Sequence, residues 1–202
     1  MTTLVVVAKE AVPGRVKTRL HPPYSLEQAA TLAQACLLDT LDVGEVLPAT
    51  RRILLIEGRG PGRPGWQEWQ QPSGGLDERL AWCLDQLSGP MLLVGMDTPH
   101  LDPAGLRPAF DWPEHVDAFL GPADDGGFWA IGLRRPDGSL VRGVPMSRDD
   151  TGAMQLRRLT GAGLRVHLLP SMRDIDTAPD LVPAAGRAPR LAAALAGCGA
   201  PR

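Results

Sequence analysis

Four cationic side chains follow the first apolar run of the sequence, all within eleven residues. They surround the bend-forming pair Pro13-Gly14 and are Lys9, Arg15, Lys17 and Arg19. A single lysine in such a loop is typical of a solvated turn, whereas neutralising a polyphosphate takes several convergent donors. The GxxxxGK[ST] pattern of a Walker P-loop is absent. The cluster therefore predicts a phosphate-binding loop of another type.

Carboxylates follow two later apolar runs. Asp97 comes directly after the apolar run 91–96, and Asp176 follows the last apolar run of the chain. Asp97 could simply cap its turn, but a carboxylate at a strand end can also hold Mg²⁺ on a phosphate. We expect Asp97 and Asp176 to share one divalent ion, Mg²⁺ or Mn²⁺, with Asp125 as the alternative to Asp176.

A glycine-rich segment, residues 121–127, joins two further apolar runs. Asp124 and Asp125 precede Gly126-Gly127, which is consistent with a simple hairpin turn carrying solvated acids. Two glycines beside two acids would equally allow a ligand to approach the backbone closely. Both interpretations stay open at this point.

The segments that must position these residues alternate between strand and helix patterns. Apolar runs predict strands at 3–8, 52–57, 91–95, 116–120, 128–133 and 164–169. Apolar spacing predicts helices at 25–42, 76–87 and 149–159, with another beginning at Asp102-Pro103. Ser25 and Gln28 form a capping-box signature, and Leu76, Leu80, Leu84 and Leu87 are expected to face inward. This alternation favours an α/β fold with helices on both faces of one sheet, whose ligands lie beyond the carboxyl ends of the strands.

Composition narrows the functional classes. The chain has 202 residues, 44% of them apolar, and a formal charge of −2, without the strong basic excess of a nucleic-acid binder. Its apolar runs are far below the ~18 residues of a membrane span, and we expect the protein not to be secreted, since its first residues lack the pattern of a signal peptide. Its 3 cysteines include no CxxC pair, which argues against a disulfide scaffold or zinc ribbon. We expect a cytoplasmic monomer or homodimer that binds neither nucleic acid nor membrane, with one domain at 1–183 and an Ala/Pro-rich tail at 184–202 containing a short helix near 190–196.

Five motifs then occur together in a recognisable order. They are Lys9…Pro13-Gly14-Arg15-Val16-Lys17-Thr18-Arg19-Leu20, Gln71…Gly75-Leu76…Arg79-Leu80, Gly95…Asp97…Pro99…Leu101, Gly121-Pro122-Ala123…Asp125-Gly126-Gly127 and Asp174-Ile175-Asp176-Thr177. On these motifs the chain resembles, over nearly its whole length, the bacterial glycosyltransferase-like family DUF2064. The resemblance implies the glycosyltransferase A fold of the nucleotide-diphospho-sugar transferases, a three-layer α/β/α Rossmann-like architecture with a mostly parallel mixed sheet. The first and last motifs are also similar to those of 2-phospholactate guanylyltransferase, and more distantly to molybdenum-cofactor guanylyltransferases.

The resemblance also implies a role for each matching residue. The nucleotide phosphates would be bound by Lys9, Gly14, Arg15, Lys17, Arg19 and Gly75. The metal would be held by Asp97 and Asp176, and the acceptor by Asp125, Gly126, Gly127 and Ser147. Lys17, Asp97 and Asp125 would be the catalytic residues.

Three activities fit this set. In the first, an acceptor phosphate or related acid attacks the α-phosphorus of a nucleoside triphosphate and releases pyrophosphate, a reaction that depends on Mg²⁺, positioning and charge neutralisation. In the second, a sugar nucleotide donates its sugar to an acceptor. In the third, the protein binds nucleotides without turnover. Because Asp97-Thr98-Pro99 offers one carboxylate rather than an Asp-x-Asp pair, the sequence favours nucleotidyl transfer.

Overall fold

A computed structural model describes residues 1–199 and contains one seven-stranded sheet. Its order is β3-β2-β1-β4-β6-β5-β7. The strands are β1 (Thr3–Lys9), β2 (Arg51–Glu57), β3 (Gln67–Gln70), β4 (Met91–Gly95), β5 (Ala118–Pro122), β6 (Phe128–Leu133) and β7 (Val166–Leu168). Strand β6 runs antiparallel to its neighbours β4 and β5, and the other pairs are parallel. The mixed, mostly parallel sheet expected from the sequence is confirmed.

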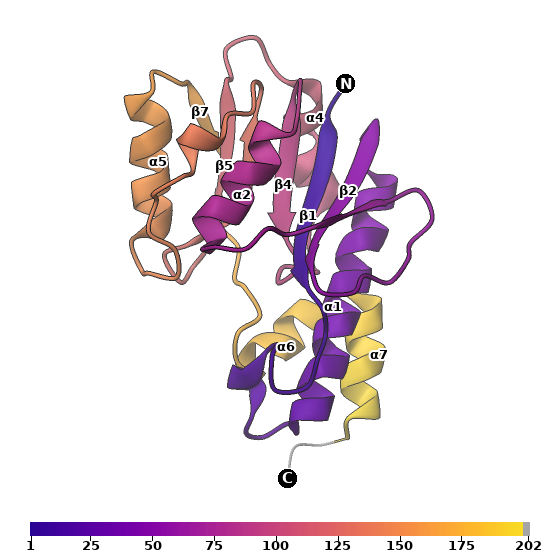
Figure 1. Ribbon diagram of the computed structural model, residues 1–202. Helices are drawn as coiled ribbons and strands as arrows, with labels where there is room; N and C mark the ends of the chain where they lie inside the picture. Colours follow the sequence, from indigo (N-terminus) through magenta and orange to yellow (C-terminus); the bar gives the residue numbers. More distant parts are fainter. Residues whose placement is uncertain (200–202) are drawn as a thin grey trace.

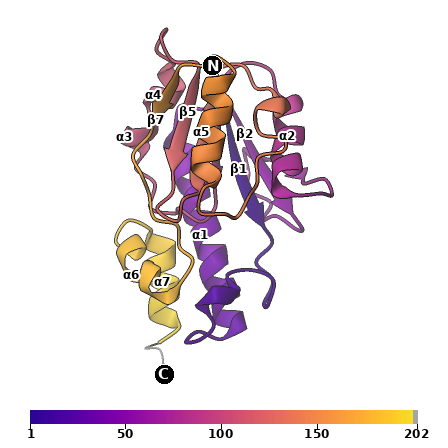
Figure 2. The same ribbon diagram turned by 90° about the vertical axis from the view of Figure 1, so that its left-hand side faces the viewer.

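Helices cover both faces of this sheet (Figures 1 and 2). They are α1 (Leu26–Val46), α2 (Leu76–Asp85), α3 (Pro103–Leu106), α4 (Pro108–Asp111), α5 (Thr151–Gly161), α6 (Ala178–Ala185) and α7 (Pro189–Gly197), with 3₁₀ turns η1 (Thr18–Leu20) and η2 (Gly138–Leu140). Val6 packs into one core with α1, α3 and α4, whereas its neighbour Val5 packs into another with α2 and α5. Because successive strand residues point to opposite faces, β1 is apolar on both faces from Leu4 to Ala8, and the three-layer architecture follows.

Most expected elements are present, with shifted ends. Ser25 and Gln28 form the predicted capping box at the start of α1, and Asp102 caps α3. Strand β3 was not expected: its side chains are mostly exposed, and backbone pairing with β2 holds it. The inward orientation expected for Leu76 is wrong. Its exposure is 43%, because it begins α2 at the rim of a cavity described below.

The long helix α1 extends beyond the sheet, where α6 and α7 pack beside it (Figure 1). Leu32 of α1 and Leu191 of α7 are fully buried in this third core. The helix expected near 190–196 corresponds to α7, and the expected boundary at 183/184 falls inside α6. The division into domain and tail stays a prediction, and residues 200–202 lie outside the described part. Among residues 1–199, no helix is long and apolar enough to cross a membrane.

Candidate active site

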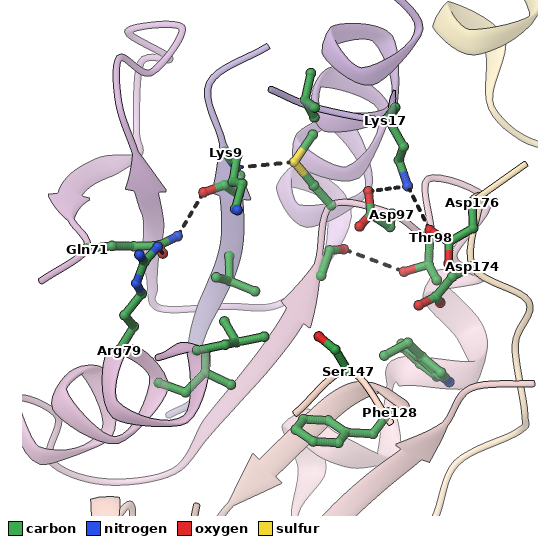
Figure 3. Close-up of a pocket in the computed structure, with 18 of the residues that line it drawn as sticks. Lys9, Lys17, Gln71, Arg79, Asp97, Thr98, Phe128, Ser147, Asp174 and Asp176 are labelled. Carbon is green, nitrogen blue, oxygen red and sulfur yellow. Dashed lines mark hydrogen bonds and ion pairs between the residues drawn. The ribbon is translucent and has the colours of Figure 1, made fainter. Parts of the chain in front are cut away.

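A cavity of about 560 Å³ opens at the carboxyl ends of β1 and β4 (Figure 3). Seven of the predicted site residues line it: Lys9, Arg15, Lys17, Arg19, Asp97, Ser147 and Asp176. Five others do not: Gly14, Gly75, Asp125, Gly126 and Gly127. The basic loop and the two separated carboxylates therefore meet at one cavity, which lies beyond the carboxyl ends of the strands as expected for ligand crevices in such sheets.

The loop after β1 is anchored on both sides of Lys17. The bend at Gly14, with φ +77°, lets the Arg15 N–H donate to the carbonyl of Val12 at 3.0 Å. Val16 and Leu20 are buried, so the segment between them is fixed against the protein. Lys17 has φ +48°, a left-handed conformation uncommon for lysine, and stands at the start of η1. Backbone strain of this kind is concentrated at functional sites.

The ammonium of Lys17 lies between the two predicted metal ligands. Its Nζ is 2.7 Å from Asp97 Oδ1 and 3.7 Å from Asp176 Oδ1, and it also donates to the carbonyl of Ile175. The Lys17 side chain is only 5% exposed. Burial alone would lower its pKa, but the charge and hydrogen bond of Asp97, with help from Asp176, outweigh burial and raise the pKa above the usual lysine value. The group is therefore a buried, fully charged cation.

Asp174 is a cavity residue to which the sequence analysis gave no role. Its Oδ1 is buried and has no hydrogen-bond partner among the described residues. Burial, together with the charges of Asp97 and Asp125, raises the pKa of this carboxyl to about 7. The spacing Asp174-x-Asp176 was the available signal, because alternate residues of an extended segment share a face. Three carboxylates thus lie at one end of the cavity.

These carboxylates suit a hard divalent cation. Within residues 1–199, no group of three or more His, Cys, Asp or Glu side chains is arranged to hold a metal by itself. Magnesium, however, is usually bound by one or two carboxylates that share it with phosphate oxygens and water. A cationic Nζ already lies between Asp97 and Asp176, and Asp174 offers an unpartnered oxygen. The residues present therefore fit Mg²⁺ or Mn²⁺ that arrives with a phosphate ligand.

A second polar group lies at the opposite end of the cavity (Figure 3). Glu57 Oε2 is 2.6 Å from Arg79 Nη1 and 3.5 Å from Lys9 Nζ. Gln71 accepts from Arg79 at 3.1 Å and donates to the carbonyl of Ala8 at 2.8 Å. Gln71 and Arg79 belong to a motif that carried the resemblance, yet they had no assigned role. This network fixes two cations beside the end of β1.

The glycine-rich turn packs against its own chain. Strands β5 and β6 form an antiparallel hairpin around it, as one of the two interpretations required. Gly126 has φ +88°, and a Cβ there would lie 1.9 Å from the carbonyl oxygen of Asp149. Asp125 accepts from the Gly127 N–H at 2.8 Å, while its charge still reaches Asp174. Chain packing thus explains Gly126, and contact of this turn with an acceptor stays a prediction.

Lysine is used in this chain only at the cavity. Of the 21 basic residues, 19 are arginine, and the only lysines are Lys9 and Lys17. Both line the cavity. A lysine ammonium is a compact point charge on a flexible stem, unlike the planar arginine fork. The chain therefore places its two lysine ammonium groups at this cavity, while its other basic side chains are arginines.

Comparison with known families and structures places this geometry in context. Residues 47–148 match the sequence profile of the family described as "Uncharacterized protein conserved in bacteria (DUF2064)". No functionally curated protein matches significantly. A Desulfovibrio desulfuricans protein assigned to the nucleotide-diphospho-sugar transferases is 23% identical, with a TM-score of 0.81, covering 97% of this chain and 94% of its own.

Two further structures share the fold at lower similarity. Rv0371c from Mycobacterium tuberculosis, determined in complex with manganese, is 20% identical over 91% of this chain and 96% of its own, with a TM-score of 0.54. A nucleotidyl transferase from Methanothermobacter thermautotroptrophicus is 16% identical over 95% of this chain and 98% of its own, with a TM-score of 0.56. At these identities the likeness shows the fold that the sequence analysis expected.

Proposed function

This chain belongs to the DUF2064 family, and we propose on that basis and from its cavity that it is a metal-dependent transferase with a nucleotide donor. The observation that carries the proposal is the buried ammonium of Lys17 between Asp97 and Asp176, at the ends of strands where nucleotide phosphates bind in such sheets. A cation flanked by carboxylates, with further cations along the cavity, suits a ligand made of phosphates and a divalent ion.

The reaction that we favour is nucleotidyl transfer. An oxygen of a small phosphorylated or acidic acceptor forms a bond to the α-phosphorus of a nucleoside triphosphate, and the bond from that phosphorus to the bridging oxygen breaks as pyrophosphate leaves. Lys9, Arg15, Lys17 and Arg19 would hold the phosphates in line with the acceptor. Gly14 and Gly75 would shape the turns beside them.

The metal would be held by Asp97 and Asp176. When bound, Mg²⁺ or Mn²⁺ would neutralise phosphate charge and stabilise the charge that develops on the leaving group. Asp125, Gly126, Gly127 and Ser147 would border the acceptor, and Asp125 would be the candidate to accept its proton. Support for Ser147 is its place in the cavity wall at φ +60°. Support for Asp125 is its electrostatic reach to Asp174.

Transfer of a sugar from a nucleotide sugar is the second candidate, and two observations favour it. The Desulfovibrio protein with the same fold is assigned to nucleotide-diphospho-sugar transferases. The triplet Asp174-Ile175-Asp176 also places two carboxylates in the cavity wall, and the sequence analysis had considered only Asp97 in this respect. Against it stands the number of cations around the cavity, which suits the greater negative charge of a triphosphate better than the diphosphate of a sugar nucleotide.

Product analysis separates the two reactions. The protein is incubated with Mg²⁺ or Mn²⁺, each nucleoside triphosphate or sugar nucleotide, and a panel of small phosphorylated acceptors. We expect pyrophosphate, formed only with a triphosphate, and its loss in the Asp97→Asn variant. Release of nucleoside diphosphate from a sugar nucleotide would instead establish glycosyl transfer. Saturable nucleotide binding with no product from any pair would contradict a transferase.

A further inference from the structure

The ammonium of Lys17 is surrounded by three acceptors of its own chain, two at hydrogen-bond distance and one as a longer ion pair. They are Asp97 Oδ1 at 2.7 Å, the carbonyl of Ile175, and Asp176 Oδ1 at 3.7 Å. An ammonium has three donors and no acceptor. In this arrangement the charge of Lys17 is taken up by groups of its own chain and not by a phosphate, the ligand that its loop and its cavity position predict for it.

The position of Nζ is also the position that a shared metal needs. A divalent ion bridging Asp97 and Asp176 must approach an oxygen of each at about 2.1 Å for Mg²⁺. The ammonium already lies between those oxygens, and two cations repel each other strongly at such short separation. Occupancy by Nζ and occupancy by a metal are therefore mutually exclusive.

The lysine can leave this position toward the cavity. Its side chain is a flexible four-carbon stem that lines the cavity wall. Asp176 also pairs with Arg19, whose Nη1 lies 3.2 Å from Asp176 Oδ2. The Arg19 side chain is 75% exposed, so this is a surface ion pair that holds Asp176 only weakly. Displacing Lys17 thus frees both carboxylates, and it releases a positive charge into the space where phosphates would lie.

We propose that Lys17 is an internal substitute for the metal, which occupies the ion's position in the nucleotide-free protein and turns to the phosphates when the metal displaces it. The inference rests on the proposed metal site and describes its regulation. Metal alone must compete with a tethered cation and binds weakly. Metal and nucleotide together bind tightly, because the displaced ammonium gains a phosphate partner. The two ligands are thereby coupled through one side chain.

Manganese binding to the nucleotide-free full-length chain tests the competition directly. Free Mn²⁺ is measured by electron paramagnetic resonance for the parent, for Lys17→Met and for Lys9→Met. Lys9→Met is the matched control, since it removes the same charge from the same cavity away from Asp97. We expect Lys17→Met to bind Mn²⁺ at least about tenfold more tightly, and Lys9→Met to change the affinity less than about threefold. Adding Asp97→Asn to Lys17→Met should abolish the gain.

Three results would overturn the inference: unchanged or weaker Mn²⁺ binding in Lys17→Met, equal tightening in Lys9→Met, or no Mn²⁺ binding to any of the proteins. Failure of the proposed function has a different signature. If no donor yields pyrophosphate or nucleoside diphosphate, yet Lys17→Met tightens Mn²⁺ in an Asp97-dependent way, the internal cation stands and the transferase proposal falls.

A second measurement follows Lys17 in the parent protein and needs a variant only to assign the signals. Because the chain has only two lysines, ¹⁵N-lysine labelling gives two side-chain signals, and Lys9→Arg assigns them. We expect slow hydrogen exchange at the Lys17 ammonium without metal, and fast exchange once Mg²⁺ saturates the site. A Lys17 signal unchanged at a Mg²⁺ concentration that displaces bound Mn²⁺ would overturn the inference.

Discussion

The backbone N–H of Ile175 donates to the carbonyl oxygen of Asp97 at 3.0 Å. This single hydrogen bond joins the loop after β4 to the segment between β7 and α6. It explains how Asp97 and Asp176, 79 positions apart, come to flank one ammonium. The site therefore depends on a main-chain contact that substitutions of its side chains leave in place, so that the Lys17 and Asp97 variants are expected to fold.

Replacing Lys17 by alanine should weaken nucleotide binding in the presence of Mg²⁺. A charge-assisted contact to a phosphate contributes about 1.5–3 kcal/mol, so the dissociation constant should rise roughly tenfold or more. Isothermal titration calorimetry measures this, with Arg157→Ala as the control, since Arg157 is exposed on α5 and does not line the cavity. Unchanged affinity in a folded Lys17→Ala protein would contradict the phosphate role.

Replacing Asp97 by asparagine should remove the effect of Mg²⁺ on nucleotide affinity. The amide keeps the size of the side chain but loses the negative charge that the ion requires. Calorimetric titrations with and without Mg²⁺ should give a strong enhancement for the parent and little for Asp97→Asn. The exposed Asp111→Asn variant should behave like the parent. Parent-like Mg²⁺ enhancement in Asp97→Asn would remove Asp97 from the metal site.

Replacing Gly126 by alanine should destabilise the protein strongly. Gly126 combines φ +88° with a Cβ position 1.9 Å from the Asp149 carbonyl oxygen, so the backbone must move. Gly163 is the matched control, because it has φ +79° but no atom within 4 Å of its Cβ position. Urea unfolding should give a loss of about 1 kcal/mol for Gly163→Ala and about 3 kcal/mol or more for Gly126→Ala. Equal losses would show that the turn accommodates a side chain.

The imidazole of His100 should make stability depend on pH. Burial, with a smaller contribution from Arg187, lowers the pKa of His100 below 6.5 in the folded protein. Below pH 6.5 the unfolded chain therefore binds more protons than the folded one, and stability decreases as the pH falls toward the folded-state value. Urea unfolding between pH 7.5 and 5 should show a shallower decrease for His100→Gln than for the parent. The exposed His115→Gln variant should retain the parent slope, and an unchanged slope in His100→Gln would assign the effect elsewhere.

Much of the fold was predictable because its signals are local. The apolar run of β1 and the capping box of Ser25 and Gln28 depend only on neighbouring residues, and both are present. Strand β3 was missed because its Gln67–Gln70 sequence is exposed and buries little apolar surface. Leu76 was misjudged because helical periodicity gives the face of a helix but not the cavity beside its first turn.

In the candidate site, too, some features were predictable from local sequence and others were not. The sequence predicted that Asp97 and Asp176 would meet, because each follows an expected strand and the carboxyl ends of parallel strands lie at the same edge of a sheet. The pairing of Lys17 with both was not predictable, because it depends on a left-handed backbone at Lys17 and on a hydrogen bond between distant loops. Arg79 and Gln71 were likewise positioned by Glu57 and by the backbone of β1, contacts that no local pattern reveals.

The packing of α7 on α1 has a consequence for folding during translation. Strands β1, β2 and β4 can pair while later residues are still being translated, yet the outer half of α1, with Leu32 and Cys36, has no cover until α6 and α7 emerge. The segment carrying Ile175 and Asp176 also emerges late. The second carboxylate partner of Lys17 is therefore translated well after the first, and the apolar face of α1 is completed only by the last two helices of the chain.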